Sequence, residues 1–295
     1  MANLKEIRNR ITSVGSTMQI TSAMKMVSAA KLKRAQDNII QLRPYANKLT
    51  EILQNLSASA ENSSEGVYSQ VREEKNVLIV AVSSNRGLCG AFNASVIRKV
   101  NVLIANDFKG KNVSVLSIGK RANDYFKKTE YNIKASYMPH NPSSVFDDLS
   151  NFEPVAEIAE KIMHAFAKGD FDKVVIVYNQ FKNAAVQILT TEQYLPVLPP
   201  EKDGESNAKA DYIFEPEKEK IIQELIPKSL KTQLYKALLD SNASEHGARM
   251  TAMHKATDNA KELQKELKLN YNKARQAAIT NEILEIVAGA EALNG

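Results

Sequence analysis

The last third of the sequence, residues 229–293, most constrains what this chain can fold into. No proline follows Pro227, and small or apolar residues recur there at alternating steps of three and four. The residues of this seam are Met253, Ala256, Ala260, Leu263, Leu267, Asn270, Ala274 and Ala277. Such steps keep residues on one side of a helix, close to a heptad repeat. About sixty helical residues would span about 90 Å, which no compact domain of this size encloses. We therefore predict a long helix that needs a partner along its length.

A second helical seam occupies the N-terminal segment. It is formed by Leu4, Ile7, Ile11, Val14, Met18 and Thr21. Pro44 indicates a kink or the start of a new turn, and the serine-rich residues 58–66 are typical of a linker. We predict an N-terminal coiled-coil helix over residues 1–58, a linker over 59–75, and a C-terminal coiled-coil helix over 216–295 that pairs with the first in antiparallel fashion.

The middle of the chain changes its hydrophobic period. Residues 77–82, 113–118 and 174–178 are short runs of β-branched apolar residues, which are typical of strands buried on both faces of a parallel sheet. Helical candidates alternate with them, at residues 91–104, 120–127 and 155–167, and residues 186–191 indicate a further strand at an edge. The fold class is therefore α/β: a central Rossmann-like domain over 76–200, a loop over 201–215, and the long antiparallel coiled coil of terminal helices.

The composition of the chain limits where in the cell we expect the protein to be found. No apolar run approaches the length that spans a bilayer, and the N-terminus, MANLKEIRNR, lacks the apolar core of a signal peptide. We therefore expect the protein to stay on the cytoplasmic side. The single cysteine, Cys89, excludes an internal disulfide.

Positive charge gathers in the first fifty residues. Only Glu6 and Asp37 oppose Lys5, Arg8, Arg10, Lys25, Lys31, Lys33, Arg34, Arg43 and Lys48. The first forty residues contain no aromatic residue, which disfavours nucleic acid as the partner, and the apolar face is alanine and methionine, which disfavours a lipid surface. A plain solvated face is one interpretation, and an acidic protein partner is the one we favour.

The segment at residues 83–92 (SSNRGLCGAF) follows a predicted strand and opens a predicted helix, where a Rossmann domain binds phosphate. It matches neither GxGxxG nor GxxxxGK[ST], so a tight turn that uses Gly87 and Gly90 is the better interpretation and nucleotide binding the lesser one. Cys89 is either a small buried side chain, which we favour, or a reactive thiol. The four histidines form no ligand set. We expect no catalytic residue, no cofactor and no metal.

Four stretches give the chain a specific resemblance. They are residues 20–35 (ITSAMKMVSAAKLKRA), 86–93 (RGLCGAFN), 244–260 (SEHGARMTAMHKATDNA) and 279–292 (ITNEILEIVAGAEA). Together they resemble the γ subunits of bacterial F-type ATP synthases over nearly the whole length. Asn85, where the family often has aspartate, and Ser28, where alanine is common, are small departures.

The resemblance implies a function. In that family the terminal helices form a shaft inside a ring of three α and three β subunits, and the α/β domain sits with the ε subunit on the membrane-embedded c ring. Proton flow turns the c ring and the shaft, which drives ATP synthesis at the catalytic sites of the α and β subunits. The chain itself would be non-catalytic, would bind no nucleic acid, and would be peripheral on the cytoplasmic face of the bacterial inner membrane, held there only through the complex.

The resemblance also implies roles for individual residues. Met24, Lys25 and Arg249 would lie near the moving β loops, and Arg275 with Gln276 would form a polar contact to β further along the shaft. Thr280 and Glu282 would support that region through helix–helix contacts. We expect Arg249→Ala to impair ATP turnover by the complex while the chain stays folded. A dinucleotide-binding enzyme with helical extensions and a basic coiled-coil protein that binds nucleic acid remain the alternatives.

Overall fold

The computed structural model describes residues 4–58, 67–131, 138, 141–197 and 218–294. Two long helices bracket the chain in sequence, α1 (Leu4–Ala58) and α6 (Lys218–Asn294). Each helix continues through a proline, Pro44 in α1 and Pro227 in α6. A proline removes one backbone donor from a helix, and the hydrogen bonds on either side can still hold the helix together. The loop expected at residues 201–215 and residues 59–66 of the expected linker lie outside the described residues.

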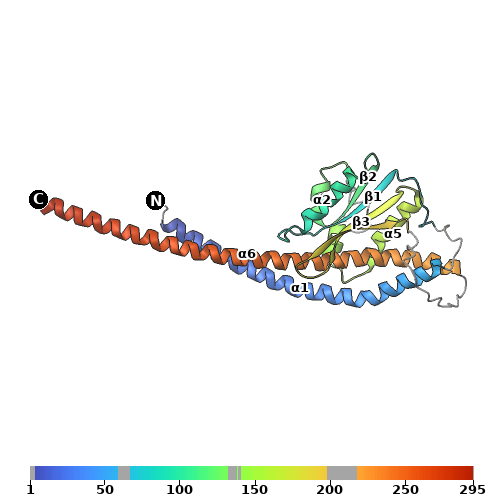
Figure 1. The fold of residues 1–295 in the computed structure, drawn as a ribbon, viewed down its shortest axis with the longest axis horizontal. Helices are drawn as coiled ribbons and strands as arrows, with labels where there is room; N and C mark the ends of the chain where they lie inside the picture. The colour runs from blue at the N-terminus through green and yellow to red at the C-terminus, as the bar shows by residue number, and fades with distance from the viewer. Residues whose placement is uncertain (1–3, 59–66, 132–137, 139–140, 198–217, 295) are drawn as a thin grey trace. The chain divides into compact units, whose positions relative to one another are not determined.

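The chain divides into two compact units, one formed by residues 1–28 and 250–295 and the other by residues 29–249. In the first unit the N-terminal part of α1 lies along α6, which continues beyond it (Figure 1). The hydroxyl of Thr257 donates a 2.8 Å hydrogen bond to that of Thr21, and the side chain of Gln264 lies against Gly15. Since the later residue of α6 meets the earlier residue of α1, the pairing is antiparallel, as the sequence predicts.

The seam of α6 agrees with the predicted one at five positions and differs from it at three. The five that are buried or half-buried are Met253, Ala256, Ala260, Leu267 and Ala274. Its most buried members are Met253, Ala260 and Leu267, but Leu263 is 40% exposed and Asn270 and Ala277 are exposed too. Between Ala260 and Leu267 the half-buried side chain is that of Gln264, one residue after Leu263. One helical residue is a rotation of about 100°, so this shift moves Leu263 to the rim of the contact.

A four-stranded sheet lies at the centre of the second unit, in the order β2-β1-β3-β4 (Figure 1). Its strands are β1 (Asn76–Val82), β2 (Asn112–Ile118), β3 (Lys173–Phe181) and β4 (Gln187–Leu195). β1 pairs in parallel with both β2 and β3, whereas β4 runs antiparallel to β3 at the edge. The three apolar runs and the edge strand predicted from the sequence are therefore confirmed.

The helices of this unit are α2 (Phe92–Ala105), α3 (Lys120–Phe126), α4 (Pro142–Asp147) and α5 (Glu153–Lys168). Sequence periodicity does not predict α4, which spans only 6 residues. Its start carries a local signal, because the side chain of Asn141 accepts a hydrogen bond from the backbone N–H of Ser143 and Pro142 occupies the first helical position. Gly169 ends α5 in the left-handed conformation, at φ 84°.

The core forms on both faces of the sheet. Val77, Ile79 and Ala81 of β1 pack on one face with Val100 of α2 and Phe126 of α3. Leu78, Val80 and Val82 alternate with them and therefore point to the opposite face, where they are 0–1% exposed. α6 is bound to the edge strand as well, because the hydroxyl of Tyr194 donates to the carbonyl of Leu230 at 3.1 Å. No helix among the described residues is long and apolar enough to cross a bilayer.

Candidate functional site

The loop after β1 is held by its own polar side chains. The hydroxyl of Ser84 donates to the carbonyl of Arg86 at 2.5 Å, and the backbone N–H of Ser84 donates to the side-chain oxygen of Asn93 at 2.9 Å. The amide of Asn93 in turn donates to the sulfur of Cys89 at 3.1 Å. Leu88 and Gly90 have positive φ values of 63° and 61°, so the chain turns sharply between the strand and α2. The tight turn predicted from the sequence is present.

Arg249 of α6 reaches this loop. Its guanidinium donates to the backbone carbonyls of Arg86 at 3.3 Å and Gly87 at 3.2 Å, and forms an ion pair with Glu245 one helical turn earlier. The side chains of Arg249 and Glu245 are only 8% and 7% exposed. Two stretches that the sequence singled out separately, 86–93 and 244–260, therefore meet in one buried polar contact.

The electrostatics of the contact depend on burial. Desolvation raises the pKa of Glu245, and the attraction of Arg249 opposes that shift. Desolvation lowers the pKa of the neighbouring His246 to about 4, and the positive charges of Arg249 and Lys31 act in the same direction. His246 is therefore neutral near pH 7, and Arg249 with Glu245 forms a charge-balanced pair.

The position of this contact bears on nucleotide binding. In an open parallel sheet, ligands bind beyond the carboxyl ends of the strands where the strand order reverses, which here is the gap between β1 and β3. A phosphate needs N–H donors, whereas at that point the loop presents the carbonyls of Arg86 and Gly87 to Arg249, and the guanidinium is already paired with Glu245. The arrangement gives no support to a phosphate site at residues 83–92.

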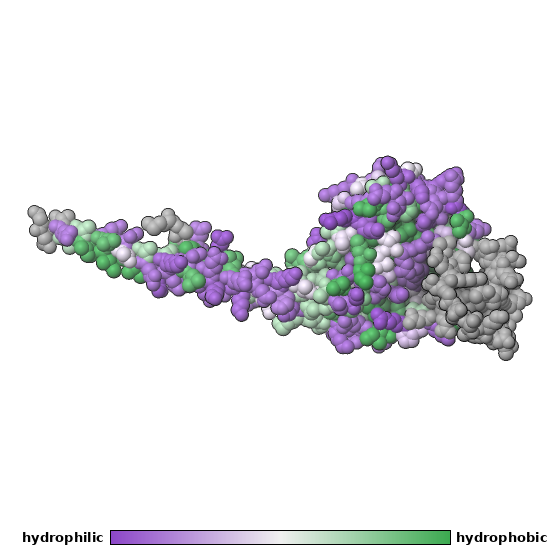
Figure 2. Space-filling model, in the orientation of Figure 1, coloured by the Kyte–Doolittle hydropathy of each residue, from purple (hydrophilic) through white to green (hydrophobic). Residues whose placement is uncertain are grey.

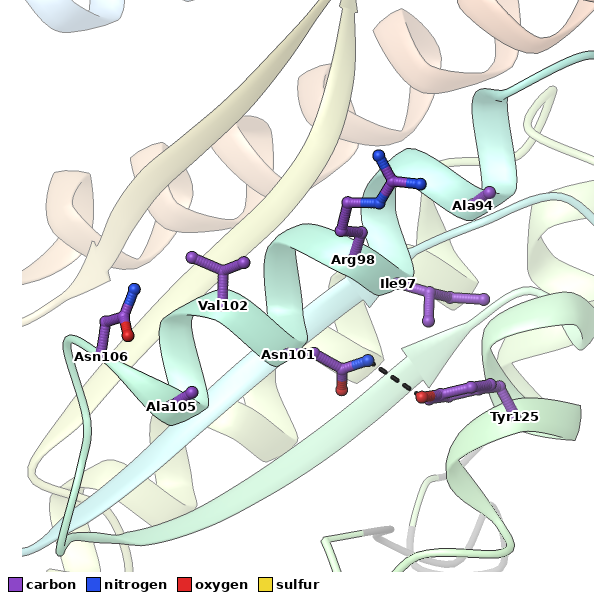
Figure 3. Close-up of a pocket in the computed structure, with 8 residues that line it drawn as sticks. All are labelled: Ala94, Ile97, Arg98, Asn101, Val102, Ala105, Asn106 and Tyr125. Atoms are coloured by element: carbon purple, nitrogen blue, oxygen red, sulfur yellow. Dashed lines mark hydrogen bonds between the residues drawn. The ribbon is translucent and has the colours of Figure 1, made fainter.

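The described residues also include a cysteine, possible metal ligands and a surface depression. Cys89 is 1% exposed and burial raises its pKa, so it is the small buried side chain that we favour from the sequence. No group of three His, Cys, Asp or Glu side chains among the described residues could hold a metal ion. A depression of about 590 Å³ lies along α2, where Asn101 donates a 2.9 Å hydrogen bond to the hydroxyl of Tyr125 (Figure 3). Its lining is Ala94, Ile97, Arg98, Asn101, Val102, Ala105, Asn106 and Tyr125.

The remaining residues that the resemblance singles out lie in the first compact unit. Met24 and Lys25 are half-buried on α1, whereas Arg275 and Gln276 are exposed on α6. Thr280 and Glu282 are exposed too, and the hydroxyl of Thr280 donates to the carbonyl of Gln276 in its own helix at 2.9 Å. Arg249 belongs to the other compact unit. The roles of all these residues toward a partner remain predictions.

The C-terminal part of α6 carries an exposed apolar stripe. The register of Thr21 with Thr257 and of Gly15 with Gln264 brings Leu4 of α1 to the level of Ala274. Every described side chain beyond Ala274 is exposed. Five large apolar side chains of this stretch, 48–66% exposed, are Ile279, Ile283, Leu284, Ile286 and Val287. Figure 2 shows hydrophobic side chains near this end of the helix.

Sequence reasoning missed Glu245, Gly247 and Ala184 as parts of the site. The spacing of Glu245 and Arg249, four residues apart on a helix, is a detectable ion-pair signal. No local signal marks Gly247 or Ala184, because their proximity depends on how α6 lies against the loop after β3.

Fold and site define a class of protein: a pair of long helices that carries an α/β domain, with the usual ligand position of that domain closed by one of its own helices. Comparison with known proteins makes the class specific. Residues 3–293 match the sequence profile of the family described as ATP synthase. The ATP synthase gamma chain of Flavobacterium johnsoniae is 63% identical over 295 residues, and that of Christiangramia forsetii is 61% identical over 295 residues. Both alignments cover 100% of each chain.

A solved structure shares the fold. It is that of Euglena gracilis mitochondrial ATP synthase with OSCP, F1 and the c-ring, in rotational state 3, and one chain in it matches with a TM-score of 0.65. The match has 19% identity and covers 98% of this chain and 94% of that chain. The chain belongs to the ATP synthase gamma chain family.

Proposed function

We propose that this chain is the central rotating shaft of an ATP synthase, a non-catalytic subunit that couples ion flow through a membrane ring to ATP synthesis on neighbouring subunits. The observation that carries the proposal is the exposed apolar stripe of α6, from Ile279 to Val287. Large apolar side chains on an isolated helix cost free energy in water, so they call for an enclosing partner. A ring of α and β subunits around the end of the shaft supplies such an enclosure.

The contacts to the catalytic subunits differ along the shaft. Met24 and Lys25 lie on the basic half of α1 and suit acidic loops of β, since exposed charge pairs form and separate more readily than deep apolar contacts. Arg275 and Gln276 are exposed on α6 and can donate hydrogen bonds to β. Arg249 lies near the β loops as well, but its side chain is buried against the carbonyls of Arg86 and Gly87 and does not bind β itself.

Support around this region comes from Thr280 and Glu282 through contacts with other helices of the assembly. The α/β domain binds the ε subunit and the c ring at the other end of the shaft. Membrane association is peripheral and arises only through the complex, at the cytoplasmic face of the bacterial inner membrane. No cofactor or nucleic acid takes part.

Reconstitution tests the proposal. The chain is mixed with separately purified α and β subunits, and complex size and ATP hydrolysis are followed together, with an α and β mixture lacking the chain as the control. We expect a particle with one copy of this chain per three α and three β, and rapid hydrolysis only when the chain is present. Failure to assemble, combined with binding of nucleotide or nucleic acid by the chain alone, would favour the enzyme or nucleic-acid alternatives.

A further inference from the structure

Residues 245–249 of α6 lie across the carboxyl ends of two neighbouring strands. β1 and β3 are adjacent and parallel, so the loops that follow them emerge side by side at one edge of the sheet. The connection from β1 leads to β2 on one side, and β3 lies on the other. Each loop contacts α6 within this single helical turn.

The contact with the loop after β1 is polar. Arg249 donates to the carbonyls of Arg86 and Gly87, and the ion pair with Glu245 fixes the direction of the guanidinium. The side chain of Arg121, at the start of α3, lies against Gly87 as well. This loop is itself held by the hydrogen bonds of Ser84 and Asn93. A displacement of the loop would therefore break several partly buried hydrogen bonds together.

The contact with the loop after β3 is steric. A side chain at Gly247 would place its Cβ 3.1 Å from the carbonyl oxygen and 3.3 Å from the Cα of Ala184. The helix approaches this closely because Gly247 has no side chain. The loop is stiff, since the side chain of Asn183 accepts hydrogen bonds from the backbone N–H groups of Ala185 at 3.0 Å and Val186 at 2.8 Å.

We name the contact set Arg86, Gly87, Ala184, Gly247 and Arg249 the crevice clamp. We propose that the crevice clamp is a point at which torque passes between the α/β domain and α6, and that Gly247 and Arg249 are its positioning residues. The inference rests on the proposed shaft function. In this proposal, torque is transmitted at the position where related α/β folds bind a ligand.

Two features suit the crevice clamp to this task. It holds α6 at two different loops, by hydrogen bonds to Arg86 and Gly87 and by close packing on Ala184, so neither loop can move past the helix without disturbing a contact. Close-packed contacts transmit strain because they have little free volume to absorb it. The buried ion pair adds a specific geometry that a smooth apolar contact would lack.

A reversible staple tests the inference in the complete membrane-bound complex. Ala184→Cys and Gly247→Cys are combined in a Cys89→Ala background, because the short distance between these positions is compatible with the Cβ separation of about 3.5–4.5 Å that a disulfide requires. Gly247→Val serves as a wedge that forces the loop away from the helix. Ala248→Val adds a similar side chain one residue along and is the matched control; Cys89→Ala alone is the reference for the staple.

Two activities are compared. ATP hydrolysis by the soluble complex of α, β and this chain requires no torque through the α/β domain, whereas ATP-driven proton pumping in vesicles does. We expect Gly247→Val and the reduced staple to lose pumping per ATP hydrolysed while soluble hydrolysis is retained. The oxidised staple should recover the pumping of its reference, and Ala248→Val should match the wild type.

Equal pumping per ATP in the wedge, the control and both redox states of the staple would overturn the inference. A parallel loss of soluble hydrolysis and pumping would overturn it too, because the damage would then lie in the shaft itself. Failure of the proposed function gives a different result, since the wild-type chain would then support neither activity.

Discussion

Thr257 of α6 donates a hydrogen bond to Thr21 of α1 at 2.8 Å, although 236 residues separate them in the sequence. This bond marks the register of the antiparallel helix pair and with it the phase of the seam. Leu267 lies in the contact at 9% exposure, and Leu263 lies at its rim at 40%. The two leucines are otherwise matched residues of the same helix.

Leu267→Ala should therefore destabilise the helix pair much more than Leu263→Ala. We expect a loss of about 2–4 kcal/mol for Leu267→Ala and less than about 1 kcal/mol for Leu263→Ala, because only the first leaves a gap in a packed contact. Urea unfolding followed by far-ultraviolet circular dichroism measures both. Equal losses would show that the phase of the seam is wrong.

Arg249→Ala should destabilise the chain itself, because it leaves Glu245 buried without its partner. The expected loss is about 3–5 kcal/mol. The expectation from the sequence is that the chain stays folded after this change, and the burial adds that its stability falls. Lys255→Ala, at an exposed position on the same helix, is the control and should change stability by less than about 0.5 kcal/mol.

The double variant Glu245→Gln with Arg249→Ala separates the two causes. It removes the buried charge that Arg249→Ala leaves behind, so part of the lost stability should return. A double variant that is no more stable than Arg249→Ala would contradict the importance of the ion pair. The lost hydrogen bonds to the loop would then be the main cause of the lower stability.

Gly119→Ala should be poorly tolerated. Gly119 has φ +100°, and a Cβ there would collide with the backbone carbonyl of Ser83. Gly110 also has positive φ, at +79°, but has open space around it. We expect a loss of about 1 kcal/mol for Gly110→Ala from backbone strain alone, and at least about 3 kcal/mol for Gly119→Ala. Thermal unfolding of both variants makes the comparison, and similar losses would mean that the contact with Ser83 is easily relaxed.

Acidification should destabilise the chain through His246. Burial, with Arg249 and Lys31 acting in the same direction, lowers its pKa to about 4, whereas an unfolded histidine has a pKa of 6.5. Between these values the unfolded state binds more protons, so stability is lost as the pH falls through this window. From pH 7 to pH 5 the loss from this group is about 2 kcal/mol. His246→Leu should remove it, as measured by urea unfolding at the two pH values.

Acidification changes stability through Asp240 in the opposite direction, so this residue serves as the internal control. Burial raises the pKa of this carboxyl to about 6, Glu192 adds to the shift, and Lys236 and Arg43 oppose it. The folded state therefore binds more protons between pH 3.8 and 6, and acidification from pH 7 to pH 5 stabilises it by about 1 kcal/mol. Asp240→Asn should steepen the acid loss, whereas His246→Leu should flatten it. Changes of the same sign in both variants would rule out this assignment.

Ile283→Asp should leave the free chain's stability unchanged within about 0.5 kcal/mol, because the side chain is exposed. Assembly with α and β should weaken, since a charge replaces an apolar contact inside the proposed ring. Asn281→Asp introduces the same charge at an exposed polar position nearby and is the matched control. Size-exclusion chromatography at falling protein concentration measures assembly, and equal effects of the two variants would argue against an apolar enclosure at Ile283.

Most of the secondary structure follows from hydrophobic period. The runs at residues 77–82, 113–118 and 174–178 are strands, and the terminal seams are helices, because burial on a sheet or along a helix face imposes its own spacing. The short helix α4 escapes this kind of reasoning, since 6 residues hold too little periodicity, although Asn141 and Pro142 mark its start. The phase of the seam cannot be predicted in this way either, because Leu263 and Gln264 lie three and four residues after Ala260 and both steps fit a helical seam.

The family and its expected function were within reach of the sequence, since four specific stretches carry them. Only the tertiary structure decided what Arg249 does. The carbonyls that it binds lie 162 and 163 residues away, and Gly247 is important only because the loop at Ala184 approaches it. The hydrophobic period of a helix or strand is set by residues a few positions apart. Contacts between residues more than 160 positions apart depend on how sheet, loop and helix pack in space. The elements and the family therefore follow from residues close together in the sequence, whereas the packing places Arg249 in a contact that holds the loop after β1.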